Sequence, residues 1–399
     1  MATLIRFFLR CVTLASILFC NATTVFATAY VPKSDATVLE RLPFKPNDPV
    51  ARELASMRAE LQRNPRHLEV AVKLAGRYYG MVGEEGDPRY LGYAQAALAP
   101  WWNLPEPPIE VQVLRARLLQ FSHNFVAAFA DLDKVLERDP NNSQARILRA
   151  IIEIVQARYD VARVDCRALN KLTSDLIVIG CEAMIDGLTG RATSAYSTLN
   201  TAFANSKNLS ADEQLWVLTR LAELSQRFGK SSVTEAHFKQ AIALGITDSF
   251  LLAAYSDFLL EQKRPAEVVA LLKDKTRSDG LLLRLLLAER SLNLPTAKDR
   301  ETILAARYLA AQLRGDTVHQ QEEARFSLHV QGNAKKALAL AQENWKVQLE
   351  PRDAHIFLEA ALALKDPKSA QPVLQWLESS KIEDSQLISL GQKLKAVKQ

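Results

Sequence analysis

The chain contains little glycine and proline for its length, with 14 glycines and 16 prolines in 399 residues. Both residues interrupt helices, so their scarcity favours a helical chain, as does the abundance of leucine, alanine and arginine. The 48% hydrophobic and 24% charged residues are ordinary for a globular protein with a large core. Because 399 residues exceed the usual size of one compact domain, we expect an all-α protein built as several domains or as a repeat array.

No excess of one charge and no basic block is present. The formal net charge is +5, and it falls to +3 if Arg6 and Arg10 are removed with an N-terminal segment. A nucleic-acid-binding protein would be expected to carry a basic stripe or patch. The composition therefore does not favour nucleic acid as a partner.

The N-terminus contains Arg6 and Arg10, then an apolar run from Cys11 to Cys20, then Ala27-Thr28-Ala29. This order is typical of a secretory signal peptide, so we expect residues 1–29 to be removed before Tyr30. An uncleaved membrane anchor is the alternative, but the apolar run is shorter than the ~20 residues that span a bilayer. Residues 30–47, with three prolines, are expected to form an extended arm. The mature protein is expected to be soluble and exported.

Motifs for catalysis, nucleotide binding and metal binding are missing from the sequence. There is no G-x-S-x-G, no G-x-G-x-x-G and no kinase signature. Gly229-Lys230-Ser231 resembles the end of a phosphate loop, but Leu224 stands where that motif requires its first glycine. The six histidines show no pairing at metal-ligand spacing. We expect no catalytic residue, no metal and no cofactor.

An acidic stretch at 83–89, "GEEGDPR", has two interpretations. It could place Glu84, Glu85 and Asp87 around calcium, but it lacks the alternating ligands of a calcium loop. The simpler interpretation is an acidic turn inserted between two helices.

A repeat of about 34 residues becomes visible when 109–142 is placed above 143–175. Ala116 then aligns with Ala150, and Ala128 aligns with Ala162. The sequence "RDPNN" at 138–142 separates the two copies, since proline cannot continue a helix while aspartate and asparagine suit a turn and the next helix cap.

The period and the placement of small residues resemble the tetratricopeptide repeat, in particular exported tetratricopeptide proteins of Gram-negative bacteria. The resemblance implies a right-handed α-solenoid of stacked helical hairpins, with protein or peptide binding as its function. We expect about nine hairpins over 48–380, most regular at 109–248, followed by a capping helix at 381–399.

Cys166 and Cys181 are the two cysteines that remain after signal cleavage. They stand at nearly equal distances on either side of the turn expected at Thr173-Ser174, so antiparallel helices would bring them face to face. An exported protein can keep a disulfide, so we expect either a Cys166–Cys181 disulfide or two buried thiols.

In the tetratricopeptide pattern, the second, fifth, ninth and twelfth residues of each repeat point into a concave groove. The resemblance places mostly apolar residues there, including Ile147, Ile151, Ile154, Met184 and Phe250, which could equally pack in the core. Polar and aromatic residues are better candidates because such residues are enriched at binding hot spots. The predicted partner-binding residues are Tyr79, Arg117, Gln120, Trp216, Glu223 and Asp257.

Three functions are compatible with this pattern. The leading hypothesis is a non-catalytic periplasmic adaptor that binds a protein or peptide partner in its groove. The second is a binding module for a glycan or peptidoglycan fragment, which would need a polar pocket with an aromatic floor. The third is a metal-dependent maturation factor using the 83–89 stretch with Tyr78 and Tyr79. A homodimer formed through an open end of the array stays an alternative.

Overall fold

The computed structural model describes residue 34 and residues 48–397. The predicted signal peptide, 1–29, lies outside the described residues, as does all of the predicted arm, 30–47, except Ser34. The chain divides at Ala55 into two units, with the boundary inside α2 (Pro49–Arg63). All of the helical hairpins lie in the second unit, Ser56–Gln399.

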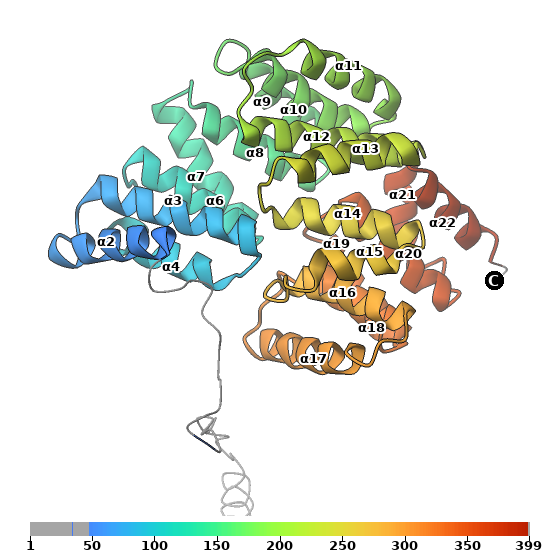
Figure 1. Cartoon of the computed structure of the whole chain (residues 1–399). Helices are drawn as coiled ribbons and strands as arrows, with labels where there is room; N and C mark the ends of the chain where they lie inside the picture. The colour runs from blue at the N-terminus through green and yellow to red at the C-terminus, as the bar shows by residue number, and fades with distance from the viewer. Residues whose placement is uncertain (1–33, 35–47, 398–399) are drawn as a thin grey trace, which may run out of the picture. The chain divides into compact units, whose positions relative to one another are not determined.

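The described residues of the second unit form nine hairpins of two helices each, followed by a last helix (Figure 1). The first helices are α3 (Leu68–Glu85), α6 (Ile109–Phe121), α8 (Ser143–Val155), α10 (Asp175–Leu188), α12 (Ala211–Arg227), α14 (Ser249–Glu261), α16 (Asp279–Ser291), α18 (Gln320–His329) and α20 (Pro351–Ala363). Their partners are α4 (Arg89–Ala97), α7 (Phe125–Arg138), α9 (Tyr159–Ala168), α11 (Ala192–Asn205), α13 (Ser231–Ala243), α15 (Pro265–Leu272), α17 (Ala297–Leu313), α19 (Ala334–Trp345) and α21 (Gln371–Ser380). The short α5 (Ala99–Trp102) follows α4, and α22 (Ser385–Lys395) ends the array. The predicted all-α solenoid of stacked helical hairpins is confirmed.

Each hairpin turn contains a residue with a positive φ angle. These residues are Gly86, His123, Ala157, Gly190, Gly229, Lys263, Asn293, Gly332 and Lys365. At Gly229, whose φ is +75°, the next N–H, that of Lys230, donates to the carbonyl of Ser225 at 3.0 Å and so closes the helix end. Gly229-Lys230-Ser231 is therefore a hairpin turn. The turn geometry recurs even where glycine is replaced, which explains why the later repeats are hard to recognise in the sequence.

The polar stop at 138–142 joins two successive hairpins. Asp139 ends α7, and the side chain of Asn142 caps α8 by accepting a hydrogen bond from the N–H of Ala145 at 3.0 Å. Asn124, Ser210, Asp248, Ser278 and Asn333 cap other helices in the same way. The boundaries between these helices are thus determined by residues next to them in the sequence.

The 34-residue period also appears in a half-buried ion pair. Arg115 of α6 is bonded to Asp131 of α7 at 2.5 Å, and 34 residues later Arg149 of α8 is bonded to Asp165 of α9 at 2.6 Å. Asp165 is only 1% exposed, so its charge depends on the arginines around it. The small residues Ala116 and Ala150 are fully buried, which allows the paired helices to approach closely.

Cys166 of α9 and Cys181 of α10 form a disulfide, and their Cα atoms lie 5.5 Å apart. This is the pair that the symmetry about the turn singled out in the sequence. The bond joins the second helix of one hairpin to the first helix of the next. Both sulfur-bearing residues belong to the apolar core.

Within residue 34 and residues 48–397, none of the helices combines the length and the hydrophobicity needed to cross a bilayer.

Candidate functional site

A cavity of about 530 Å³ lies among the first helices of the later hairpins. Side chains of α10, α12, α14, α16, α18 and α20 line it, together with α22 and the end of α8. Pockets for small ligands usually have volumes of about 300–1,000 Å³. The cavity is thus large enough for a small or short ligand.

The cavity runs along the direction of α14. Phe250, near the start of that helix, and Glu261, its last residue, both line the cavity. Eleven residues of helix at 1.5 Å each correspond to about 16 Å. The site is therefore elongated, with one end near Phe250 and the other near Glu261.

Asp257 lies in the middle of the cavity wall and binds two arginines. Arg284 Nη2 donates to Asp257 Oδ2 at 2.5 Å, and Arg325 Nη1 donates to Asp257 Oδ1 at 2.6 Å. Burial alone would raise the pKa of Asp257, but the two guanidinium groups outweigh it and hold that pKa below its ordinary value. Asp257 therefore joins α14 to α16 and α18 as an ionised carboxylate.

Phe250 provides an aromatic ring at one end of the cavity. The guanidinium of Arg220 lies over this ring at 4.8 Å from the centroid, and that of Arg352 lies at 5.6 Å. Arg220 is also paired with Glu223 at 3.0 Å, and Arg352 with Glu350 at 2.7 Å. These cation–π contacts fix both arginines against the wall.

Glu359 of α20 binds two histidines. His329 Nε2 lies 2.9 Å from Glu359 Oε2, and His355 Nδ1 lies 3.5 Å from the same oxygen. Burial would raise the pKa of Glu359, but its contacts with the histidines lower it strongly. Burial would lower the pKa of His355, but the contact with Glu359 raises it. This group holds α18 against α20.

Glu261 lies at the opposite end from Phe250 and is exposed to the cavity. Its Oε2 accepts hydrogen bonds from Gln226 Nε2 of α12 and from Gln386 Nε2 of α22, both at 2.8 Å. Two amides from different helices thus orient this carboxylate, and they bring no positive charge to it.

Of the six predicted partner-binding residues, Glu223 and Asp257 line the cavity. Tyr79 and Arg117 contact each other instead, with the guanidinium 6.0 Å from the ring centroid, and do not line it. Burial raises the pKa of the Tyr79 hydroxyl. Gln120 lies half-buried on α6, outside the cavity lining.

Trp216, the remaining predicted residue, packs between helices rather than lining the cavity. A side-chain carbon placed on Gly180 of α10 would lie 2.3 Å from the Trp216 ring, so the ring sits directly against the α10 backbone. Gly180 is therefore required for this close approach of α10 and α12. The aromatic enrichment of binding sites pointed to Trp216, but in this chain the indole fills a space left by glycine.

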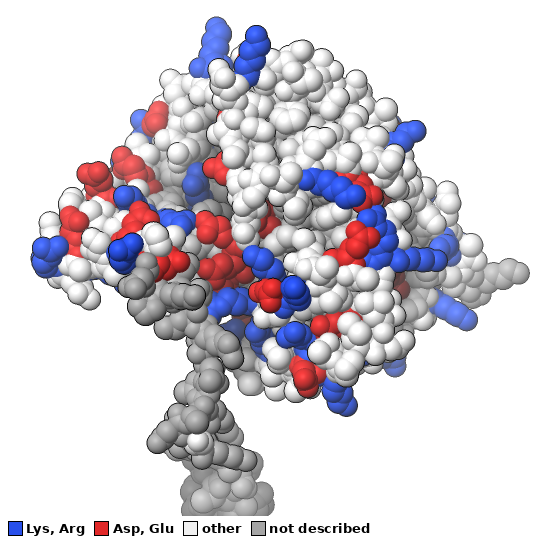
Figure 2. All heavy atoms as spheres, viewed as in Figure 1, with Lys and Arg blue, Asp and Glu red and all other residues white. Residues whose placement is uncertain are grey.

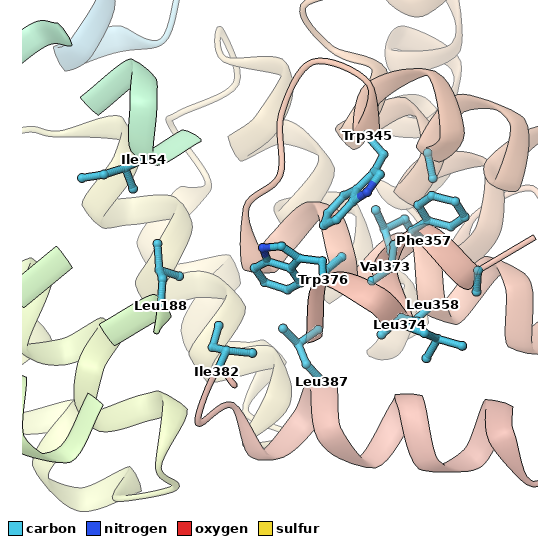
Figure 3. Close-up of a cluster of buried hydrophobic side chains, with 14 of the residues drawn as sticks. Ile154, Leu188, Trp345, Phe357, Leu358, Val373, Leu374, Trp376, Ile382 and Leu387 are labelled. Atoms are coloured by element: carbon cyan, nitrogen blue, oxygen red, sulfur yellow. The ribbon is translucent and has the colours of Figure 1, made fainter. Parts of the chain in front are cut away.

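Some apolar positions of the predicted groove pack against the chain's own C-terminal helices. Ile147 and Met184 pack against a cluster that contains Ile154 and also Trp345 and Trp376. Figure 3 shows Ile154 and Leu188 on one side of this cluster and Trp376, Ile382 and Leu387 on the other. Trp376 Nε1 also donates to the hydroxyl of Tyr159 at 3.1 Å. We call the segment from α20 to α22 the C-terminal cover.

Arginines of the cavity were missed in the sequence. Arg220, Arg227, Arg284, Arg325 and Arg352 all line it. Arg284 could have been found, because it interrupts the apolar run "LLLRLLL" at 281–287 and is only 4% exposed. A charge within a leucine-rich helix needs a buried partner, which here is Asp257.

The acidic stretch at 83–89 is held by arginines. Asp87 accepts from Arg89 Nη2 at 2.7 Å and from Arg277 Nη1 at 3.3 Å, and Glu84 pairs with Arg77 at 2.9 Å. The prediction of an enlarged turn there is wrong, since α3 continues to Glu85 and only residues 86–88 form the turn. Among the described residues, no group of three His, Cys, Asp or Glu could hold a metal ion.

The face shown in Figure 2 carries interspersed acidic and basic side chains, and no broad area of that face has one sign. Mixed charge of this kind gives no sustained attraction for a polyanion.

No family model and no curated protein sequence matches the chain. Among solved structures, it is similar to a human IFIT1 dimer with m7Gppp-AAAA, at a TM-score of 0.39 and 16% identity, covering 87% of this chain and 86% of that one. It is also similar to yeast Tom70, at a TM-score of 0.41 and 11% identity, covering 87% of this chain and 85% of that one. Similarities at such low scores carry no information about the function of this chain.

Proposed function

We propose that the protein is an exported, non-catalytic scaffold that binds a short extended peptide segment of a partner in the cavity along α14. The observation that carries this proposal is the convergence of the first helices of successive hairpins on one polar cavity of about 530 Å³. Its wall presents guanidinium, carboxylate and amide groups in fixed positions, which suits a polar ligand. Such preorganised groups limit the entropy cost of binding.

The length of the cavity along α14 sets the size of an extended segment. An extended chain advances about 3.3 Å per residue, so about five residues span 16 Å. The segment is therefore short.

Two observations support binding over catalysis and over a glycan ligand. The described residues that line the cavity include no serine, threonine, cysteine or lysine, so no alcohol, thiol or amine nucleophile is available there. A sugar would stack on a free aromatic face, but Arg220 and Arg352 already lie over the Phe250 ring. A peptide can instead use the amide and charged groups of the wall.

Export to the periplasm belongs to the same proposal. It is supported by the signal-like N-terminus and by the Cys166–Cys181 pair, since a disulfide persists in an oxidising compartment. We expect the protein recovered from the periplasm of expressing cells to begin at Tyr30 and to contain no free thiol. Intact-mass measurement would show an unprocessed chain or two free thiols if the proposal were wrong.

Photo-crosslinking in the native envelope tests the binding site. A photoreactive residue at Leu287, which lines the cavity, is compared with one at Val126, which is 84% exposed on α7 and lies outside it. We expect Leu287 to capture a defined partner segment that mass spectrometry identifies, and Val126 not to capture it. Equal capture at both positions, or no capture at Leu287, would reject the cavity as the binding site.

A further inference from the structure

Two carboxylates at the Glu261 end of the cavity are bonded only to neutral donors. Glu261 Oε2 accepts from the amides of Gln226 and Gln386. Asp384 Oδ1 accepts from the backbone N–H groups of Gln386 at 3.1 Å and Leu387 at 3.0 Å, as the cap of α22. Within the part of the chain that the structure describes, Glu261 Oε1 and Asp384 Oδ2 accept no hydrogen bond.

The other four carboxylates of the cavity each have a cationic or histidine partner. Asp257 has two arginines, Glu359 has two histidines, and Glu223 and Glu350 each have one arginine. Such pairing is the usual condition for carboxylates withdrawn from bulk water. Glu261 and Asp384 depart from it, although both line the same cavity.

Gln386 brings the two carboxylates together. Its side chain donates to Glu261 and its backbone N–H donates to Asp384, so both acids adjoin one residue of α22. Glu261 is also the last residue of α14, where the helix dipole adds negative potential. Among the cationic side chains that line the cavity, Arg227 lies against Gly187 of α10. His355 contacts Glu359 and also interacts electrostatically with Glu261.

We propose that Glu261 and Asp384 bind a cationic side chain of the ligand, a lysine ammonium or an arginine guanidinium. This inference rests on the proposed function and adds that the bound segment is basic at one position. Two carboxylates with a free oxygen each can accept the several N–H donors of such a group. Two carboxylates do not form a metal site of three or more ligands, and no such group of His, Cys, Asp or Glu occurs among the described residues.

The electrostatic surroundings agree with this arrangement. Burial raises the pKa of Glu261, and the nearby Asp257 carboxylate adds to the increase, while the two amide hydrogen bonds and the charge of His355 act against it. A cation bound beside Glu261 would favour its ionised form. Binding and ionisation are thus expected to support each other.

The test uses the mature chain, 30–399, and two probes that differ in one charge. The probes are the acetylated and amidated pentapeptides Gly-Gly-Lys-Gly-Gly and Gly-Gly-norleucine-Gly-Gly, measured by calorimetry at low ionic strength. We expect the lysine peptide to bind at least tenfold more tightly than the norleucine peptide. Leu287→Trp, which fills the cavity, should weaken both.

The double variant Glu261→Gln, Asp384→Asn removes both charges and keeps an oxygen that can accept each existing hydrogen bond. The double variant should bind the two peptides equally. The control Glu343→Gln changes an exposed side chain of α19 outside the cavity and should keep the tenfold preference. A thermal melt confirms that the variants fold.

Equal binding of both peptides to the native chain would overturn the cation inference and leave the peptide-binding function standing. A lysine preference that survives in the double variant would place the cation site elsewhere and also overturn the inference. Failure of both peptides to bind the native chain at millimolar concentration would reject the inference together with the proposed function.

Discussion

The concave positions of α8 and α14 carry different residues and have different neighbours. On α8, the ninth and twelfth repeat positions are Ile151 and Ile154, and Ile154 is 4% exposed, packed in a cluster with the C-terminal cover at the edge of the cavity. On α14, the same positions are Asp257 and Leu260, and both line the open cavity. One repeat face thus serves two purposes within a single chain.

The difference follows from the cost of exposing each kind of side chain. An apolar stripe left in water is unfavourable, so the stripe on α8 is covered by α20 to α22. A charged wall can stay open to water, because each charge is solvated or paired. The repeat pattern alone therefore identifies concave positions, while polarity indicates which of them remain free for a ligand.

The largest expected effect comes from damaging the cover. Trp376→Ala removes a nearly buried indole from the shared cluster, and we expect a loss of about 3–5 kcal/mol in the free energy of unfolding, measured with urea. Tyr159→Phe removes only the hydrogen bond to Trp376 and should cost about 1 kcal/mol. Similar losses in the two variants would mean that the cover does not depend on apolar packing.

Breaking the disulfide should have the next largest effect. Cys166→Ala with Cys181→Ala releases a loop closed over 15 residues, for which roughly 3 kcal/mol is expected. The comparison is made between the oxidised native chain and the double variant. A native chain whose stability is insensitive to dithiothreitol would contradict the expectation.

The repeating ion pair should matter less than the cover. Arg149→Met leaves Asp165 buried with Arg146 as its remaining partner at 3.0 Å, so we expect a loss of about 2 kcal/mol. Arg227→Met, in the cavity, should change stability by less than about 0.5 kcal/mol, because Arg227 forms no ion pair with an acidic side chain among the described residues. A reversed order would show that the cavity charges, and not the repeat ion pairs, hold the array together.

A separate expectation concerns a pH dependence within the cover. Burial and the neighbouring Glu350 carboxylate raise the pKa of Asp353, so its stabilising contribution is complete below the unfolded pKa of about 3.9. That contribution is lost as the pH rises through the higher folded pKa. Asp353→Asn keeps an acceptor for the N–H of Glu350, so stability should fall less steeply between pH 5 and pH 8 than in the native chain. Parallel curves for the two proteins would contradict the assignment.

The sequence predicted the fold better than the site. The spacing of Ala116 and Ala150 and the stop at 138–142 are local features, and they were sufficient for the hairpin architecture. Trp216 and Arg117 were predicted to bind a partner because of their residue types. In the structure Trp216 packs against Gly180 and Arg117 lies over Tyr79, and these contacts depend on neighbouring hairpins.

The C-terminal cover could not be predicted at all, because it brings Trp376 to Tyr159 across 217 residues of sequence. No period or motif encodes a contact at that separation. Arg284, in contrast, could have been predicted as a buried charge, because it is the one charged residue in the leucine run 281–287.

Amide hydrogen exchange of the mature chain, with and without the segment captured at Leu287, tests the division between covered and open faces most directly. We expect the bound segment to increase protection in α12, α14 and α22, while α8 and α21 are protected equally in both states. Increased protection along α8 together with loss of protection in α20 to α22 would mean that the partner displaces the C-terminal cover and binds the apolar face. That result would contradict the division proposed here.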